Sequence, residues 1–318
     1  MEKYLPTAIA AVEQAALICQ KVQQKLVTED TLIKKDRSPV TIADLASQAV
    51  ICKTLKEAYP QMPIIAEEDA QSLGQPENKA VLDKIAEMLP EMTRDEILDS
   101  IDAGNGTQAD EFWTLDPIDG TKGFLRGDQY AVALALIHNG QPVLGVLGCP
   151  NLSPQGGAEQ GLLFYTAGNG AYYKNMGADQ ATAVQASEND GSGPVRFLES
   201  VESGHANHGL QSKIATPFGE NAQVVRYDSQ VKYAVLARGE ADVYLRLPNP
   251  KSPDYREKIW DHAAGVAIIR AAGGRVSDMY GKELDFSLGK KLLNNRGVVV
   301  SNGKVHERII SLIKESAE

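Results

Sequence analysis

Cysteine is scarce in this chain of 318 residues, which contains only Cys19, Cys52 and Cys149. The three lie far apart and form no CxxC pair, so the sequence offers neither a disulfide framework nor a cysteine-based zinc site. This usage is typical of a protein that works in a reducing compartment.

Positively charged residues are also fewer than negatively charged ones: the chain has 32 Lys and Arg residues and 42 Asp and Glu residues, so its net charge is −10. Such acidity argues against a nucleic-acid polymer or an anionic membrane as partner. A small anionic substrate stays compatible with it, provided that metal ions and a few local cationic side chains attract the substrate.

Long apolar runs are absent, and Glu13 interrupts the apolar stretch near the N-terminus. We therefore expect neither a signal peptide nor a membrane span, and predict a soluble cytoplasmic protein. An organelle protein that has lost its transit peptide would have the same features. Apolar residues make up 43% and charged residues 23%, as in ordinary globular proteins.

The stretch at residues 113–126, WTLDPIDGTKGFLR, combines a strand pattern with two acids. Its first three residues predict a short strand, which we expect to end at Asp116-Pro117 because proline cannot donate to a ladder. Asp116 and Asp119 then lie at a strand's carboxyl end, a common place for active sites in α/β folds. Carboxylates this close repel each other unless a cation lies between them, and Mg²⁺ prefers such oxygen ligands.

A helix is expected to begin at Gly120-Thr121, where free backbone N–H groups could hold a phosphate. The alternative is a simple turn, because Asp-Pro and Asp-Gly are both common turn dipeptides. On the residues alone, the two interpretations have equal weight.

The segment DPIDGTKGF resembles the signature of the inositol-monophosphatase superfamily of Mg²⁺-dependent, lithium-sensitive phosphatases. Its longer form, DPIDGTKGFLRGDQYAVALALI, is similar to the 3′(2′),5′-bisphosphate nucleotidase branch. The resemblance implies that Asp116, Asp119 and the Ile118 carbonyl bind metal. It also implies that the N–H groups of Gly120 and Thr121 bind phosphoryl oxygens, and that the Thr121 hydroxyl orients the attacking water.

A second acidic segment is SPVTIAD, residues 38–44. The span Thr41–Asp44 fits the capping-box pattern, so we expect Asp44 to cap a helix start, a contribution of roughly 0.5–2 kcal/mol. The segment also resembles the family's first catalytic segment, which implies that Asp44 helps to bind a metal and to activate water. We expect Asp44 to have both roles.

A third acidic segment is PIIAEED, residues 63–69, in which a short apolar strand runs into acids. A run of acids is usually a solvated face. The segment resembles the family's GEE motif, with Ala66 at the usual glycine position. That match implies that Glu67 is a metal ligand and that Glu68 is a weaker ligand or supports one.

A fourth carboxylate comes from IWDHAAG, residues 259–265, which predicts Asp261 in the first turn of a helix. Stabilisation of the helix dipole, about 0.3–1 kcal/mol, is the ordinary explanation for such an acid. The segment also resembles the family's WDxAAG motif, which implies a metal ligand on the opposite wall of the site. His262 is expected to pack nearby and not to bind metal, because the site favours oxygen donors.

The nucleotide pocket is expected from DSQ at residues 228–230, from Lys232 and from YLRLP at residues 244–248, which resemble the nucleotidase substrate pocket. Ser229, Lys232 and Arg246 are the candidate substrate ligands. Lys232 and Arg246 could neutralise a second phosphate, and the alternative for both is surface ion pairing.

Two histidines, His205 and His208 in ESGHANHG, resemble the segment beside the adenosine. His208 is the better match, and either could be structural.

The predicted elements divide the chain into two halves. The first half has helices at residues 5–26 and 45–60, a surface insertion at 70–112, and hairpins that turn at Asn139-Gly140 and Gly168-Asn169-Gly170. Strands and helices alternate in the second half, after a loop at 176–194 near a domain boundary. We expect one domain at 1–175, carrying most metal ligands, and another at 176–318, carrying the nucleotide pocket and the last ligand.

The expected fold is a layered α-β-α-β-α sandwich of the sugar-phosphatase type, with an antiparallel sheet in the first half and mixed α/β structure in the second. The resemblance implies a phosphatase that holds two or three Mg²⁺ ions and removes the 3′-phosphate of adenosine 3′,5′-bisphosphate. It also implies activity on 3′-phosphoadenosine 5′-phosphosulfate. The alternatives are an inositol or sugar phosphate phosphatase and a nucleotide-binding sensor with low turnover.

Overall fold

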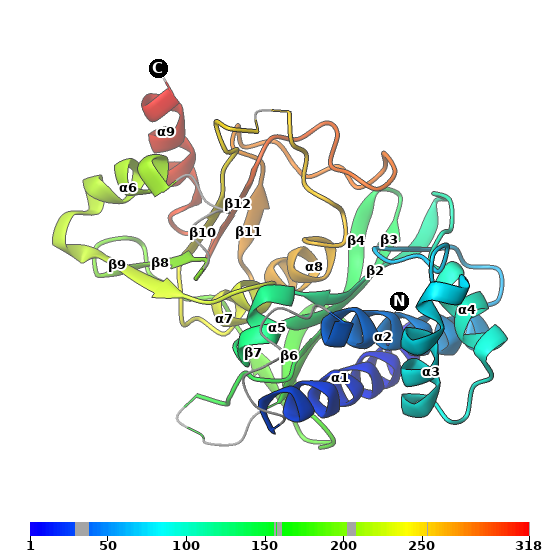
Figure 1. The fold of residues 1–318 in the computed structure, drawn as a ribbon. Helices are drawn as coiled ribbons and strands as arrows, with labels where there is room; N and C mark the ends of the chain where they lie inside the picture. Colours follow the sequence, from blue (N-terminus) through cyan, green and yellow to red (C-terminus); the bar gives the residue numbers. More distant parts are fainter. Residues whose placement is uncertain (29–37, 156, 158–160, 202–207, 253, 318) are drawn as a thin grey trace.

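A computed structural model describes residues 1–28, 38–155, 157, 161–201, 208–252 and 254–317. Its elements form the expected five layers, α-β-α-β-α (Figure 1). Helices α1 (Leu5–Thr28) and α2 (Ser38–Ala58) cover one face of a seven-stranded sheet. Helices α7 (Val231–Ala237) and α8 (Ala263–Ala271) fill the space between that sheet and a five-stranded one.

The larger sheet has its strands in chain order, from β1 to β7. All neighbours pair antiparallel except β1 and β2, which are parallel. The strands are β1 (Ile64–Ala66), β2 (Glu111–Asp119), β3 (Ala131–His138), β4 (Gln141–Cys149), β5 (Leu162–Ala167), β6 (Gly170–Asn175) and β7 (Ala181–Val184).

Both predicted hairpins are confirmed. Asn139 and Gly140 have φ of 49° and 73°, so both central residues of the β3–β4 turn are left-handed, as the tightest hairpin turns require. The stretch 176–194 is not only a loop, since its residues 181–184 form the edge strand β7. The prediction missed this strand because it is short, largely exposed and rich in alanine. The proposed domain division at residue 175 stays a prediction.

The smaller sheet has the order β11-β12-β10-β8-β9 and mixes parallel with antiparallel pairs. Two helices, α6 (His208–Ala215) and α9 (His306–Ala317), cover its outer face. Strands and helices alternate in the second half, as predicted. The strands are β8 (Val195–Glu199), β9 (Ala222–Arg226), β10 (Val243–Arg246), β11 (Arg275–Ser277) and β12 (Val298–Ser301).

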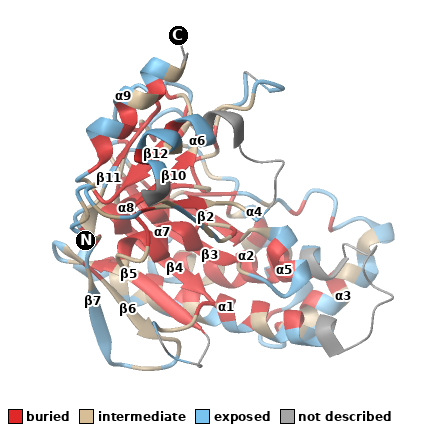
Figure 2. Ribbon diagram, turned by 90° about the vertical axis from the view of Figure 1, so that its left-hand side faces the viewer, coloured by how far each residue is buried: buried red, intermediate tan, exposed pale blue. Residues whose placement is uncertain are grey.

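The most buried elements are the central strands and the helices α7 and α8 between the sheets (Figure 2). Their close approach depends on glycine: a Cβ on Gly265 of α8 would lie 2.2 Å from the ring of Tyr233 on α7. This packing fixes α8, and with it the segment that precedes α8, against the rest of the core.

The stretch 70–112 is more than a polar surface insertion. It contains two helices, α3 (Lys79–Met88) and α4 (Arg94–Asp102), and both pack apolar side chains against α2. The sequence held a signal for α4, because Thr93 and Glu96 form a capping box. Among the described residues, no helix combines the length and the hydropathy needed to cross a membrane.

Candidate metal and phosphate site

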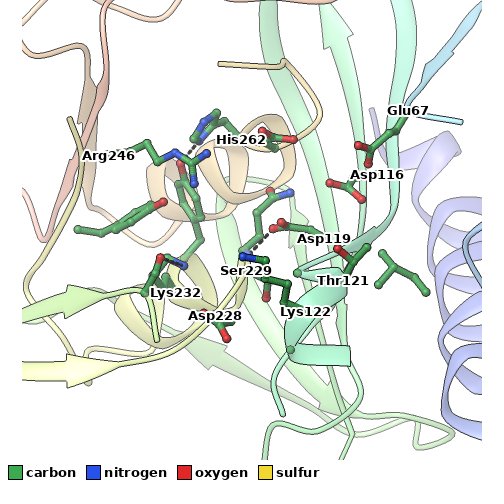
Figure 3. A pocket seen from close by; sticks show the side chains of 18 of the residues that line it. Glu67, Asp116, Asp119, Thr121, Lys122, Asp228, Ser229, Lys232, Arg246 and His262 are labelled. Atoms are coloured by element: carbon green, nitrogen blue, oxygen red, sulfur yellow. Dashed lines mark hydrogen bonds between the residues drawn. The ribbon is translucent and has the colours of Figure 1, made fainter. Parts of the chain in front are cut away.

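Residues from both halves of the chain meet in one pocket (Figure 3). The site residues expected from the sequence that line it are Glu67, Asp116, Ile118, Asp119, Gly120, Thr121, Ser229, Lys232, Arg246 and Asp261. Asp44 lies close by but not in the lining. His205 lies outside the described residues, and of His208 only the backbone, at the start of α6, is described.

Strand β2 does not end at Asp116-Pro117 as expected but continues to Asp119. Its register with β3 shifts there, since the four residues from Asp116 to Asp119 oppose the three from Ala133 to Ala131. The bulge explains why proline is tolerated inside this strand. On a regular strand, residues three apart point to opposite faces, so the extra residue lets Asp116 and Asp119 line the same pocket.

The helix expected after Gly120 is confirmed as α5 (Thr121–Arg126). Gly120 precedes it with φ of 92°, and a Cβ at this position would lie 2.8 Å from the Cβ of Ser229. Glycine therefore allows both the left-handed turn and the close packing of residue 229. Thr121 is the first residue of the helix and is exposed in the pocket.

Asp116 and Glu67 form an acidic wall. Burial, with the negative charges of Glu67 and Asp119, raises the pKa of Asp116 well above its ordinary value. Loss of surrounding water, with the charges of Glu68 and Asp119, raises the pKa of Glu67 to about 7, although Glu67 stays accessible to solvent. The Oδ1 atom of Asp116 is buried without a hydrogen-bond partner. A cation at this wall would relieve both the repulsion and the missing contact.

Asp44 is not a helix cap, because it lies inside α2 and not at its start. The residue is buried, and burial together with the charges of Glu68 and Glu67 raises its pKa well above the ordinary value. Gln48 on the next turn of α2 holds the acidic segment in place, since its side chain bonds the backbone O and N of Glu68 at 2.6 and 3.1 Å. The buried carboxyl group of Asp44 therefore lies next to the acidic wall.

The opposite wall carries the cations Lys232 and Arg246 (Figure 3). Lys232 is 3% exposed, which excludes surface pairing, and its Nζ donates to Ser200 Oγ and the Tyr227 carbonyl at 3.3 Å each. Burial lowers its pKa to about 8. A lysine held in this way is charged at neutral pH and directed at the pocket.

Arg246 is bound to a residue that the sequence did not single out. Its Nε lies 3.2 Å from Glu257 Oε2, and the same oxygen lies 3.3 Å from His262 Nε2. His262 Nδ1 in turn lies 2.7 Å from the hydroxyl of Tyr233. Burial alone would raise the pKa of Glu257, but the bond to His262 and the charge of Arg246 outweigh it and lower the pKa. Glu257 has no spacing pattern that would have revealed it.

Asp261 is influenced by charges from both walls of the pocket. It precedes the N-cap residue His262 of α8 and so stands just outside the first turn where it was expected. Burial and the charge of Asp119 raise its pKa, and Arg246 opposes this rise. Donor atoms of Glu257, Asp261 and His262 lie within 4.8 Å of one another, close enough to share a cation. Two of these three are already tied into the Arg246 network, which leaves Asp261 as the available donor.

Comparisons with known proteins identify the family of the chain. The model of the inositol monophosphatase family matches residues 1–318. The 3′(2′),5′-bisphosphate nucleotidase of Dictyostelium discoideum is 41% identical, with 100% of this chain and 98% of the relative covered. That of Schizosaccharomyces pombe is 40% identical, with coverage of 95% and 92%.

Solved structures share the fold at lower identity. CysQ from Bacteroides thetaiotaomicron, a bacterial member of the inositol monophosphatase family, is 22% identical with a TM-score of 0.64, covering 95% of this chain and 98% of its own. The inositol monophosphatase of Thermotoga maritima is 19% identical with a TM-score of 0.66, covering 99% and 98%. With a family match along its whole length, the chain belongs to the inositol monophosphatase family.

Proposed function

We propose that this protein is a Mg²⁺-dependent phosphatase that removes the 3′-phosphate of adenosine 3′,5′-bisphosphate and yields AMP and inorganic phosphate. The observation that carries the proposal is the division of one pocket into an acidic and a cationic wall. A metal-dependent phosphatase needs the acidic wall to bind its metal ions, and a substrate with a second phosphate needs the cationic wall. The nucleotidase relatives, which match over 92% and 98% of their own length, support the choice of substrate.

The donor set fits a hard divalent cation, because it consists of carboxylates and a carbonyl and includes the unpartnered Oδ1 of Asp116. Two or three Mg²⁺ ions would be held by Glu67, Asp116, Asp119, Asp261 and the Ile118 carbonyl. When bound, Mg²⁺ acts as a Lewis acid on the phosphoryl group and lowers the pKa of a water molecule.

The chain's own groups then have separate tasks. The Thr121 hydroxyl orients the attacking water, and Asp44 accepts its proton. The N–H groups of Gly120 and Thr121 donate to phosphoryl oxygens as charge builds up on them. As the water oxygen bonds to phosphorus, the bond to the ribose 3′-oxygen breaks. That oxygen takes a proton from solvent water, and Asp44 returns the proton that it accepted to the solvent.

The phosphate that is not cleaved is assigned to Lys232 and Arg246, and the ribose side of the substrate to Ser229. Arg246 has further N–H groups besides the Nε atom that faces Glu257, so it can bind both partners. His208 is assigned to the adenosine. The sulfated relative, 3′-phosphoadenosine 5′-phosphosulfate, carries the same 3′-phosphate and an anionic 5′-phosphosulfate in place of the 5′-phosphate, and is a second substrate. The three buried, unbridged cysteines support a reducing compartment such as the cytoplasm.

A turnover assay tests the proposal directly. We expect phosphate release from adenosine 3′,5′-bisphosphate in the presence of Mg²⁺, and loss of release with excess chelator. A preference for inositol 1-phosphate or fructose 1,6-bisphosphate would make the protein a sugar phosphate phosphatase. Tight nucleotide binding with negligible release from all three substrates would instead indicate a sensor.

A further inference from the structure

The side chain of Gln230 is almost completely enclosed, at 1% exposure, where the chain turns from β9 into α7. Its backbone N–H donates to Oδ2 of Asp119, a bond drawn as a dashed line in Figure 3. One of the acids at the carboxyl end of β2 is thus held by a residue from the other half of the chain.

The side-chain amide of Gln230 reaches a different segment. Its Nε2 donates to the Trp260 carbonyl at 2.9 Å, and its Oε1 accepts from the N–H of Gly265 at 3.1 Å. The N–H of Gly265 lies in the first turn of α8 and has no acceptor within the helix, so the glutamine supplies one. Asp261 lies in the chain between these two anchor points, so the amide fixes the segment that carries it.

The turn that carries Gln230 is itself firmly anchored. The carboxylate of Asp228 accepts from Arg126 of α5 and from the N–H of Val201, the latter at 3.1 Å. Ser229 has φ of 61°, which is unusual for a residue other than glycine, and packs against Gly120. Such a conformation persists only where the surroundings hold it, so the turn is a fixed point from which Gln230 can act.

We propose that Gln230 is a positioning residue that sets the separation of Asp119 and Asp261, so that carboxylates from the two halves of the chain bind the same group of cations. This inference rests on the proposed metal site. Partners that orient metal ligands commonly change metal affinity by about 10–100-fold when they are removed.

The test compares Gln230→Met with a matched control, Gln23→Met. Methionine has a similar volume and no amide, so both variants lose a buried amide. Gln23 is also buried and also makes two side-chain bonds, to the Phe124 carbonyl at 2.8 Å and to Asn151 at 2.9 Å. Neither of its partners is an expected metal ligand.

Mg²⁺ binding is measured by titration calorimetry, and unfolding temperatures are measured without metal. We expect Gln230→Met to weaken Mg²⁺ binding by about 10–100-fold and Gln23→Met to leave it unchanged, although both variants unfold at lower temperature. If both variants bind Mg²⁺ as the wild type does, Gln230 is only a structural residue. If the wild type itself binds no Mg²⁺, the proposed metal site fails first and independently.

Gln230→Glu gives a second test should the methionine variant not fold. The carboxylate keeps an acceptor for the N–H of Gly265 but cannot donate to the Trp260 carbonyl, which it would repel. Its added negative charge should by itself attract Mg²⁺, so weaker binding in a variant that is still folded at the assay temperature indicates misplaced ligands. Binding as tight as in the wild type, or tighter, would overturn the inference.

Discussion

The two walls of the pocket differ in how far the protein itself satisfies their charges. On the acidic wall, Asp116 has a buried oxygen without a partner, and burial and repulsion raise the pKa of both Asp116 and Glu67. On the cationic wall, Lys232 has two hydrogen-bond acceptors and Arg246 has a carboxylate. The acidic wall is therefore incomplete without an external cation, whereas the cationic wall is already organised when the pocket is empty of substrate.

Asp119 connects the walls. Burial raises its pKa, while the charge of Lys232, the N–H of Gln230 and the charge of Arg246 all oppose the rise. The pKa of Asp119 therefore depends on the charges of the cationic wall.

The largest effect is expected from Asp116→Asn on the acidic wall. The amide keeps the shape but removes a metal-binding charge, so turnover should fall by about a hundredfold or more, even at high Mg²⁺. The fold should survive, because repulsion with Glu67 and Asp119 is relieved. In thermal unfolding, Mg²⁺ should stabilise the wild type and have little effect on the variant.

Asp278→Asn is a matched control, since Asp278 is also buried but lies outside the pocket and binds the N–H groups of Tyr280 and Lys282. It should lose stability and keep its Mg²⁺ response. Near-native turnover of Asp116→Asn at saturating Mg²⁺ would refute the proposed role of Asp116.

Thr121→Ala should act on the chemical step. A hydroxyl that orients the attacking water contributes mainly in the transition state, so kcat should fall by about a hundredfold with little change in KM. Steady-state kinetics at saturating Mg²⁺ measure both constants. If KM alone rises, Thr121 binds substrate and does not orient water.

The sequence predicted the acidic wall better than the cationic one. Its carboxylates stand at the ends of apolar strands or beside helix starts, where periodicity and turn chemistry locate them. The bulge that brings Asp116 and Asp119 to one face was not predicted, because proline alone indicates a strand end and not a register shift. Asp44 was misplaced as a cap for a similar reason, since its helix begins one turn earlier than the capping pattern suggests.

On the cationic wall, the partners of Lys232 and Arg246 depend on tertiary contacts. Lys232 bonds Ser200 and Tyr227, and Arg246 pairs with Glu257, which also contacts His262. His262 reaches Tyr233 of α7 across the close packing of α7 on α8, which requires glycine at position 265. No local sequence pattern predicts contacts between segments that are this far apart in the chain. The layer order of the fold was predictable. Long periodic elements in the second half and clear hairpins in the first allow only a few ways to stack the helices and sheets.

A smaller effect is expected from Lys232→Met on the cationic wall. Loss of a hydrogen bond to a charged group costs about 1.5–3 kcal/mol, so kcat/KM for adenosine 3′,5′-bisphosphate should fall by about tenfold to a hundredfold. Hydrolysis of 3′-AMP, which lacks the second phosphate, should hardly change, and the same comparison applies to Arg246→Ala. Equal losses on both substrates would mean that these residues support the fold or the metal site.

The smallest effect is a pH dependence confined to the bisphosphate substrate. Burial lowers the pKa of Lys232 to about 8, so the side chain is charged below that pH and loses its charge as the pH rises through it. Only the charged form attracts the second phosphate, so affinity for the bisphosphate should be lost as the pH rises above about 8.

The measured quantity is the ratio of kcat/KM for adenosine 3′,5′-bisphosphate to kcat/KM for 3′-AMP. This ratio should fall by up to about tenfold between about pH 7 and 9. The ratio removes changes in the metals and the attacking water, because both substrates use them. In Lys232→Met the ratio should be low and independent of pH. A ratio that declines equally in the variant would assign the titration to another group, whereas a flat ratio in the wild type would mean that Lys232 does not bind the second phosphate.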